Sequence, residues 1–247
     1  MQRSLPFIII GVVIVVFTAG GALLLHAKVP KPVKTATSVP GAEPPHVRGG
    51  AQAKVTLEEF SDFQCPSCGI VSTAVQQVEH DYGDKVRVIF REFPLAAQPF
   101  AFTAACAAES AGLQDRFWPM HDQLFENAAF WAKDSPPAGT EAPIEKLAWV
   151  RKTYIRYATK AGVDLEQFYA DFDTEKVTSR IKADQARGAS LGVDLTPVLF
   201  LNGVKIPFTS FNTVEALHKV IDAALAGKLP QPDTSTPIPI QTPSATP

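Results

Sequence analysis

Hydrophobic residues divide this chain into an apolar N-terminal run, a proline-rich polar segment, a long patterned region and a polar tail. From Leu5 to Leu25 no residue is charged. At about 1.5 Å per helical residue this run reaches roughly 31 Å, about the thickness of the hydrocarbon core of a bilayer. We predict a signal anchor over residues 1–28. The alternative is a signal peptide cleaved near Ala19–Ala22, and either interpretation sends the rest of the chain across a membrane.

Two segments lack the apolar periodicity of a folded unit. Residues 29–51 contain five prolines and few large apolar groups, which predicts a stiff, extended linker. Residues 229–247 combine prolines with Thr, Ser and Gln, which predicts a disordered tail. The globular domain is therefore expected over residues 52–228.

The globular region opens with a strand-helix-strand pattern. Residues 54–60 alternate as a strand, with Val55, Leu57 and Glu59 on one face. Residues 68–82 carry apolar positions at helical spacing, and residues 85–93 return to a strand pattern. This order predicts a parallel strand pair with a right-handed crossover.

Helical spacing then dominates residues 97–191, apart from an expected loop over residues 130–142. An apolar strand over residues 198–201, an Asn202-Gly203 hairpin turn and a return strand over residues 204–207 follow. The last helix is expected over residues 213–226, with Asn212 as its N-cap. Together these elements predict an α/β domain with a mixed sheet and an inserted helical subdomain.

Composition narrows the class of function. The chain has 247 residues, 46% of them hydrophobic, which suffices for one sizeable core. The formal net charge is −2, so nothing in the charge indicates a nucleic-acid partner. Three cysteines are too few for a scaffold stapled by disulfides, and two of them, Cys65 and Cys68, have only two residues between them.

A metal site is the first interpretation of this spacing, but a structural zinc ion needs four ligands. The sequence has no second C-x-x-C, and its five histidines are scattered without ligand spacing. Gly69 stands where c-type haem attachment requires His. We therefore predict neither a metal nor another cofactor.

Redox chemistry fits the position of the two thiols better. Cys65 follows the first strand, and Pro66 suits the first position of a helix because its missing N–H would be unpaired there anyway. Cys65 is then the N-cap, where free N–H groups and the helix dipole favour a thiolate. Its pKa should fall below the free value of about 8.5. Cys68, one turn further, should be more buried and keep its proton, so Cys65 attacks and Cys68 resolves the mixed disulfide.

Three motifs resemble the DsbA-like thiol–disulfide oxidoreductases of the thioredoxin superfamily: EEFSDFQCPSC (residues 58–68), FWPMHDQLF (residues 117–125) and TPVLFLNG (residues 196–203). The resemblance implies a thioredoxin-like fold that exchanges disulfides with reduced exported polypeptides. It implies the same attacking and resolving roles for Cys65 and Cys68, with Pro66 and Ser67 as the active-site dipeptide.

The resemblance also implies two further parts of the site. Thr196 and Pro197 would form a cis-proline loop that packs against the cysteines and pairs with substrate backbone. Glu59 matches a buried acid behind the cysteines, and it independently shares a face with Val55 and Leu57, so we predict that it takes or relays the Cys68 proton.

Three other side chains are expected to have no part in the chemistry. Glu58 and Asp62 are expected to be surface carboxylates. Cys106 lies among alanines in AACAAESAGL and should only fill space between helices.

One departure from the family leaves the redox direction open. The most strongly oxidising relatives carry His where this chain has Ser67, a weaker and uncharged donor. We expect a membrane-anchored oxidase on the extracytoplasmic side of the membrane, recharged by a quinone-linked membrane oxidase of the DsbB or VKOR type. The alternatives are a reductase or isomerase of the same fold and, more remotely, a carrier that binds a metal at its C-x-x-C.

Overall fold

The computed structural model describes residues 39–132 and 143–228. The predicted signal anchor, much of the predicted linker and the predicted tail lie outside these residues. None of the helices within the two described ranges combines the length and the apolar composition needed to cross a membrane.

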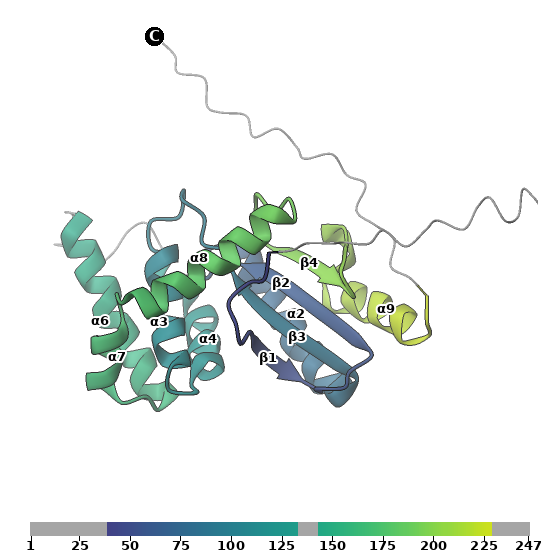
Figure 1. Cartoon of the computed structure of the whole chain (residues 1–247), viewed down its shortest axis with the longest axis horizontal. Helices are drawn as coiled ribbons and strands as arrows, with labels where there is room; N and C mark the ends of the chain where they lie inside the picture. Colours follow the sequence, from purple (N-terminus) through teal and green to yellow (C-terminus); the bar gives the residue numbers. More distant parts are fainter. Residues whose placement is uncertain (1–38, 133–142, 229–247) are drawn as a thin grey trace, which may run out of the picture. The chain divides into compact units, whose positions relative to one another are not determined.

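From β2 onward the described elements follow the predicted order: a strand-helix-strand unit, a run of helices, a hairpin and a last helix (Figure 1). They are β1 (His46–Gly49), β2 (Val55–Ser61), α2 (Pro66–Tyr82), β3 (Val86–Glu92), α3 (Ala101–Gly112), α4 (Phe117–Glu126), α5 (Ala128–Trp131), α6 (Pro143–Ala161), α7 (Leu165–Asp171), α8 (Glu175–Ser190), β4 (Val198–Leu201), β5 (Val204–Lys205) and α9 (Val214–Leu225).

The strands of the described chain form one mixed five-stranded sheet in the order β1-β3-β2-β4-β5. β2 and β3 run parallel and are joined by α2, which confirms the predicted strand-helix-strand unit. β1, β4 and β5 each pair antiparallel to their neighbours. The register places Glu59 opposite Phe90 and Ser61 opposite Glu92, at the ends of the two central strands. The expected thioredoxin-like α/β fold is present.

Strand alternation sends the side chains of β2 to two different layers. Val55 and Leu57 are fully buried in one core cluster with residues of α2 and α9. The other face carries Phe60, which α8 covers. Close approach of α8 depends on Gly188, because a Cβ there would lie 2.7 Å from the Phe93 ring and 3.0 Å from the Phe60 ring.

The predicted helical insertion is confirmed as a helical cluster beside the sheet, from which α8 leads back across it (Figure 1). Its core contains fully buried side chains such as Met120, Leu124 and Tyr154. Most of the loop predicted over residues 130–142 lies outside the described residues, and Phe130 and Trp131 at its expected start belong to α5 instead. The Trp131 side chain is fully buried and its indole N–H donates to the Leu124 carbonyl at 2.8 Å, so packing extends the helix.

The predicted linker ends earlier than residue 51, because residues 46–49 form the edge strand β1. The segment before β1 is also bound to the domain through its carbonyl groups. Arg91 donates to the carbonyl of Ala42 at 2.9 Å and Arg187 to that of Val39 at 3.1 Å. Local sequence could not reveal this attachment, because the arginines that provide it are 49 and 148 residues away in the chain.

Glu58 is not the surface carboxylate that was expected; only 8% of it is exposed. Its carboxylate accepts from Arg91 Nε at 2.9 Å and from Arg187 Nε at 2.6 Å. Burial alone would raise the Glu58 pKa, but the two guanidinium groups outweigh burial and hold it below the ordinary value. Asp184 on α8 extends the network by accepting from Arg91 Nη1 at 3.0 Å.

The C-terminal hairpin and helix follow the prediction with two differences. Asn202 and Gly203 both have positive φ, 49° and 80°, as the predicted turn requires. The return strand β5 is shorter than expected and ends at Lys205. The N-cap of α9 is Thr213 rather than Asn212, because the Thr213 side chain accepts from the Ala216 N–H.

Candidate active site

Cys65 lies at the junction between β2 and α2, as predicted. Its backbone is extended (φ −76°, ψ 121°), and Pro66 starts the helix directly after it. The Cys65 N–H donates to the Asp62 carbonyl at 3.1 Å, and the Cys65 carbonyl accepts from Gly69 N–H at 3.3 Å. These bonds close the turn and hold the sulfur at the N-terminus of a 17-residue helix. Cys65 and Pro66 reach solvent there, whereas Cys68 does not.

The environment of Cys65 favours the thiolate. The neighbouring Cys68 thiol makes the largest contribution, and together with the N–H groups of Cys68 and Ser67 it lowers the Cys65 pKa to about 5, against the opposing effect of burial. The Cys65 side chain nevertheless makes no formal N-cap hydrogen bond. The pKa therefore shifts in the expected direction, and a cysteine-to-cysteine interaction is its leading cause.

Cys68 has the opposite character. It is fully buried, and burial raises its pKa well above the ordinary value, with a further increase from Cys65. The Asp62 backbone N–H points at the Cys68 sulfur at 3.5 Å. The two thiols therefore differ at neutral pH, because Cys65 is a half-buried thiolate and Cys68 is a buried, protonated thiol.

The loop that precedes β4 meets Cys65 from the other side. The Thr196–Pro197 peptide bond is cis, and the Cys65 sulfur lies 3.6 Å from the Thr196 carbonyl oxygen. The hydroxyl of Thr196 also contributes to lowering the Cys65 pKa. The structure therefore brings together two segments that are 131 residues apart in the chain.

Glu59 is buried on β2, as predicted, with 2% of the residue exposed. Burial raises its pKa to about 7; the nearby Glu79 adds to this effect, and the Ser61 side chain opposes it. The Ser61 side chain also lowers the pKa of Cys68. Ser61 therefore affects the pKa of both Glu59 and Cys68, although its hydroxyl forms no hydrogen bond with a described atom.

Asp62 is a residue of the site that sequence reasoning missed. It was expected at the surface, yet only 1% of it is exposed. Its carboxylate accepts from the Gln64 N–H at 2.7 Å and the Leu95 N–H at 2.9 Å, which explains why a carboxyl is tolerated there. Burial nevertheless raises its pKa to about 6, and the Cys65 charge contributes to the increase. The local signal was the Asp itself, because Asp side chains commonly accept from the backbone N–H two residues further on in a turn.

Gln64 is a second residue that the sequence did not single out. Its side-chain oxygen accepts from the Phe100 N–H at 2.7 Å, and its side-chain nitrogen donates to the Ala132 carbonyl at 3.2 Å. Both partners belong to the helical insertion, so Gln64 ties the residue before Cys65 to that subdomain.

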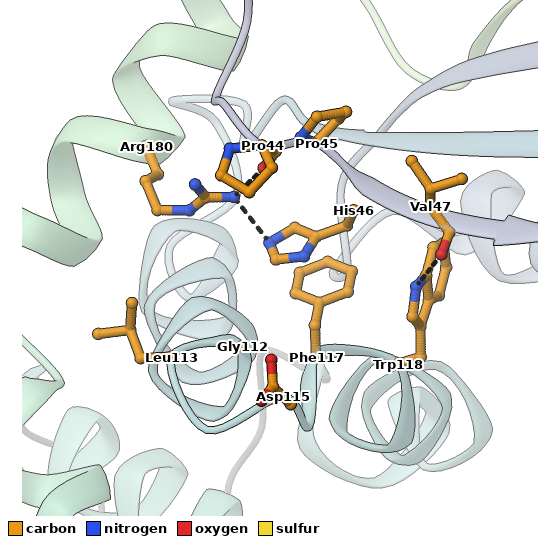
Figure 2. A pocket seen from close by; sticks show the side chains of 10 residues that line it. All are labelled: Pro44, Pro45, His46, Val47, Gly112, Leu113, Asp115, Phe117, Trp118 and Arg180. Atoms are coloured by element: carbon orange, nitrogen blue, oxygen red, sulfur yellow. Dashed lines mark hydrogen bonds between the residues drawn. The ribbon is translucent and has the colours of Figure 1, made fainter. Parts of the chain in front are cut away.

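One cavity of the described residues lies away from the cysteine pair. A cavity of about 430 Å³ lies between the start of β1 and the helices α3 and α4 (Figure 2). His46 stacks on Phe117 there, with ring centroids 3.4 Å apart. The residues that line it include neither cysteine of the pair nor Pro197. Among the described residues no group of His, Cys, Asp and Glu has the arrangement of a metal site.

Comparison with known proteins gives a consistent picture of the fold. A family model described as thioredoxin matches residues 42–223. The structure of BdbD from Bacillus subtilis is 25% identical, with a TM-score of 0.58, and the match covers 76% of this chain and 98% of BdbD. A thioredoxin-like oxidoreductase from Silicibacter pomeroyi is 27% identical, with a TM-score of 0.56, covering 74% and 92% of the two chains. Wolbachia pipientis alpha-DsbA1 shares the fold at 18% identity and a TM-score of 0.60, covering 82% and 96%.

The curated relatives are much longer proteins. The Na(+)/H(+) antiporter NhaA 1 of Mycolicibacterium gilvum is 36% identical over 178 residues, which is 70% of this chain and 26% of the antiporter. A homologous NhaA 1 from Salinispora arenicola matches at 35% identity over 74% of this chain and 25% of its own length. The chain thus spans about a quarter of the length of these relatives. The name antiporter refers to the whole of each relative and not to the matched part.

Proposed function

Because this chain belongs to the thioredoxin family, and within it to the DsbA-like thiol–disulfide oxidoreductases, we propose that it donates a disulfide to reduced exported polypeptides outside the cytoplasm. The observation that carries the proposal is the unequal pair of thiols at the start of α2. A surface thiolate and a buried thiol one turn apart are the arrangement that a two-step exchange needs.

In the oxidised protein Cys65 and Cys68 share a disulfide. A substrate thiolate attacks the Cys65 sulfur, and the Cys65–Cys68 bond breaks with its electron pair going to Cys68. A second substrate thiolate then attacks its partner sulfur in the mixed disulfide, which releases the oxidised substrate and the Cys65 thiolate. Cys65 leaves easily because its thiolate is stable, with a pKa of about 5.

The remaining predicted residues have supporting roles in this mechanism. Thr196 and Pro197 form the loop along which we propose that an extended substrate segment binds, a role supported by the Thr196 carbonyl oxygen 3.6 Å from the Cys65 sulfur. No described residue accepts a hydrogen bond from the Thr196 N–H, so this N–H is free to bind substrate backbone. Glu59 supplies the proton that Cys68 takes up when the disulfide opens, for which a carboxyl with a pKa of about 7 is suited.

The low pKa of Cys65 favours donation over reduction. Stabilising the thiolate stabilises the reduced form, and a stable reduced form makes the disulfide a stronger oxidant. Ser67 in place of His removes one known source of that stabilisation, but the Cys68 thiol and the backbone N–H groups provide others. After each cycle the reduced pair must pass its electrons on, and we propose a quinone-linked membrane oxidase of the DsbB or VKOR type as the acceptor.

The direction of disulfide exchange can be tested by equilibrating the purified protein with glutathione. Mass spectrometry then follows the fraction of protein with the Cys65–Cys68 disulfide. We expect a potential nearer to about −120 mV, the range of strong oxidants, than to about −270 mV, the range of reductases. A value at or below about −250 mV would favour the reductase alternative. Cys65→Ser should abolish exchange, and stoichiometric binding of Cu(I) or Zn²⁺ by the pair would instead favour the metal carrier.

A further inference from the structure

A buried hydroxyl lies between the proposed proton donor and the resolving cysteine. Glu59 and Ser61 are two residues apart on β2, so both side chains point to the same face of the sheet. Cys68 at the start of α2 is next to that end of β2, because the Asp62 N–H that follows Ser61 reaches the Cys68 sulfur at 3.5 Å. All three side chains are sealed from solvent, with exposures of 2% for Glu59, 1% for Ser61 and 0% for Cys68.

The Ser61 hydroxyl has no hydrogen-bond partner among the described residues. Its Oγ is buried, and Oε1 of Glu59 is likewise buried and has no hydrogen bond to another described atom. Buried polar atoms are nearly always paired, so unpaired ones at a reactive site call for a functional explanation. The buried hydroxyl of Ser110 contrasts with this, since it donates to the Cys106 carbonyl at 2.7 Å within its own helix.

Ser61 also influences the pKa of both acidic groups. Its side chain lowers the pKa of Glu59 and, independently, that of Cys68. A hydroxyl carries one proton and two lone pairs and can rotate, so it donates to one group while accepting from another. Four other titratable groups lie near Glu59, Ser61 and Cys68. Glu79 on α2 is partly neutralised by Arg48 at 3.3 Å, and Asp62 accepts from backbone N–H groups. Glu92 pairs with Ser61 across the two strands, where burial raises its pKa well above the ordinary value, and Cys65 carries the thiolate beside Cys68.

We propose that Ser61 relays the proton of Cys68. The Ser61 hydroxyl would link the Glu59 carboxyl to the Cys68 sulfur. When the disulfide opens, Ser61 gives its proton to the Cys68 thiolate and takes the Glu59 proton, which leaves Glu59 ionised. When Cys68 attacks a mixed disulfide, the same two transfers run backwards and Glu59 is protonated again. This inference rests on the proposed two-cysteine exchange and adds the path of its proton.

The reaction of the reduced protein with the aromatic disulfide dithiobis(nitrobenzoate) separates the two steps. The first nitrothiobenzoate released reports attack by Cys65, and the second reports attack by Cys68 on the mixed disulfide. Ser61→Ala should slow the second release about tenfold at pH 7 and leave the first within about twofold, since acid–base assistance commonly contributes a factor of this order or larger.

Ser61→Thr and Ser61→Val form the matched pair, because the two side chains have nearly the same shape and only Thr keeps the hydroxyl. Thr should restore the second release to within about threefold of the native rate, and Val should not. The pair also gives the same comparison if Ser61→Ala does not fold. Ser110→Ala, which removes a buried hydroxyl from α3, should change neither step.

The pH profile distinguishes proton transfer from a structural effect. In the native protein the second release should rise with the ionisation of Glu59, whose pKa is about 7. In Ser61→Val this rise should move to higher pH, and adding Glu59→Gln should slow the step no further, because both changes interrupt one path. Equal second-step rates in the Thr and Val variants would overturn the inference, whereas a native protein that never releases a second equivalent would overturn the proposed function itself.

Discussion

At the scale of single residues, the reactivity of this site comes from one thiol acting on another. Cys65 was expected to owe its low pKa to the start of a helix, and the helix N–H groups do contribute. The Cys68 thiol contributes more, because it remains protonated in its buried position and can donate to the Cys65 sulfur. Burial of one cysteine therefore activates the other.

Cys68→Ala should consequently raise the pKa of Cys65 from about 5 towards the free value of about 8.5. This pKa is measured from the alkylation rate as a function of pH, with the modified residue identified by mass spectrometry. Cys106→Ala serves as the control and should leave the midpoint unchanged. An unchanged midpoint in Cys68→Ala would assign the shift to the helix alone, and a native midpoint above 8 would contradict the role of Cys65.

The same shift makes the stability of the reduced protein depend on pH. The folded pKa of Cys65 lies below its unfolded value, so the thiolate stabilises the fold fully above the unfolded pKa and loses this contribution as pH falls through about 5. Chemical unfolding of the reduced protein should therefore show stability rising from about pH 5 to about pH 9 relative to Cys65→Ser. Parallel curves for the two proteins would contradict the shifted pKa.

Packing alone accounts for the burial and the raised pKa of Cys106. It is 1% exposed on α3, and burial raises its pKa to about 12, so it forms no thiolate near neutral pH. Cys106→Ala should keep exchange activity within about twofold and cost about 1 kcal/mol of unfolding free energy. A folded Cys106→Ala protein without activity, or a native disulfide at Cys106, would show that a third cysteine takes part.

At the scale of elements, buried charges join α8 and the segment before β1 to the sheet. Arg91 is 4% exposed and contacts the carboxylates of Glu58 and Asp184 and the carbonyl of Ala42. Charges buried at this depth are tolerated only as a complete set, because removing one partner leaves another unpaired in a medium of low dielectric constant. The network therefore defines where the folded domain begins.

Arg91→Met should cost about 3–5 kcal/mol of unfolding free energy, measured by urea denaturation, since it leaves the buried Asp184 carboxylate without its cation and removes one of the two guanidinium groups that bind Glu58. Arg151→Met is the matched control. The bond of Arg151 to Asp173 at 2.8 Å joins side chains that are 42% and 61% exposed, so its loss should cost less than about 1 kcal/mol. Similar costs for the two variants would mean that the network contributes no more than a surface ion pair.

At the scale of the whole molecule, the apolar run from Leu5 to Leu25 predicts attachment to a membrane. The full-length protein should stay with membranes after alkaline carbonate washing, and its domain should be open to protease added outside the cytoplasmic membrane. A soluble product that starts near Leu23 would show instead that the segment is a cleaved signal peptide. A domain protected from external protease would contradict the extracytoplasmic location.

The sequence by itself determined the order of elements, the parallel strand pair and the place of Cys65 at the start of a helix. These follow from periodicity, from Pro66 and from turn residues such as Asn202-Gly203, all of which act over a few residues. The cis bond before Pro197 and the buried acid Glu59 were reached through the resemblance of whole motifs. Local physics alone left the cis bond open, whereas strand alternation also placed Glu59 on the face of Val55 and Leu57.

Only the tertiary structure decided which carboxylates are buried and what keeps them there. Glu58 and Asp62 have the sequence pattern of surface acids, yet Arg187, 129 residues further on, and the N–H of Leu95, 33 residues further on, make burial possible. The start of the domain before residue 51 and the meeting of Cys65 with Thr196 likewise depend on distant partners. The physical reason is the same throughout: a buried polar group is stable only with its partner, and chain folding alone brings these partners together.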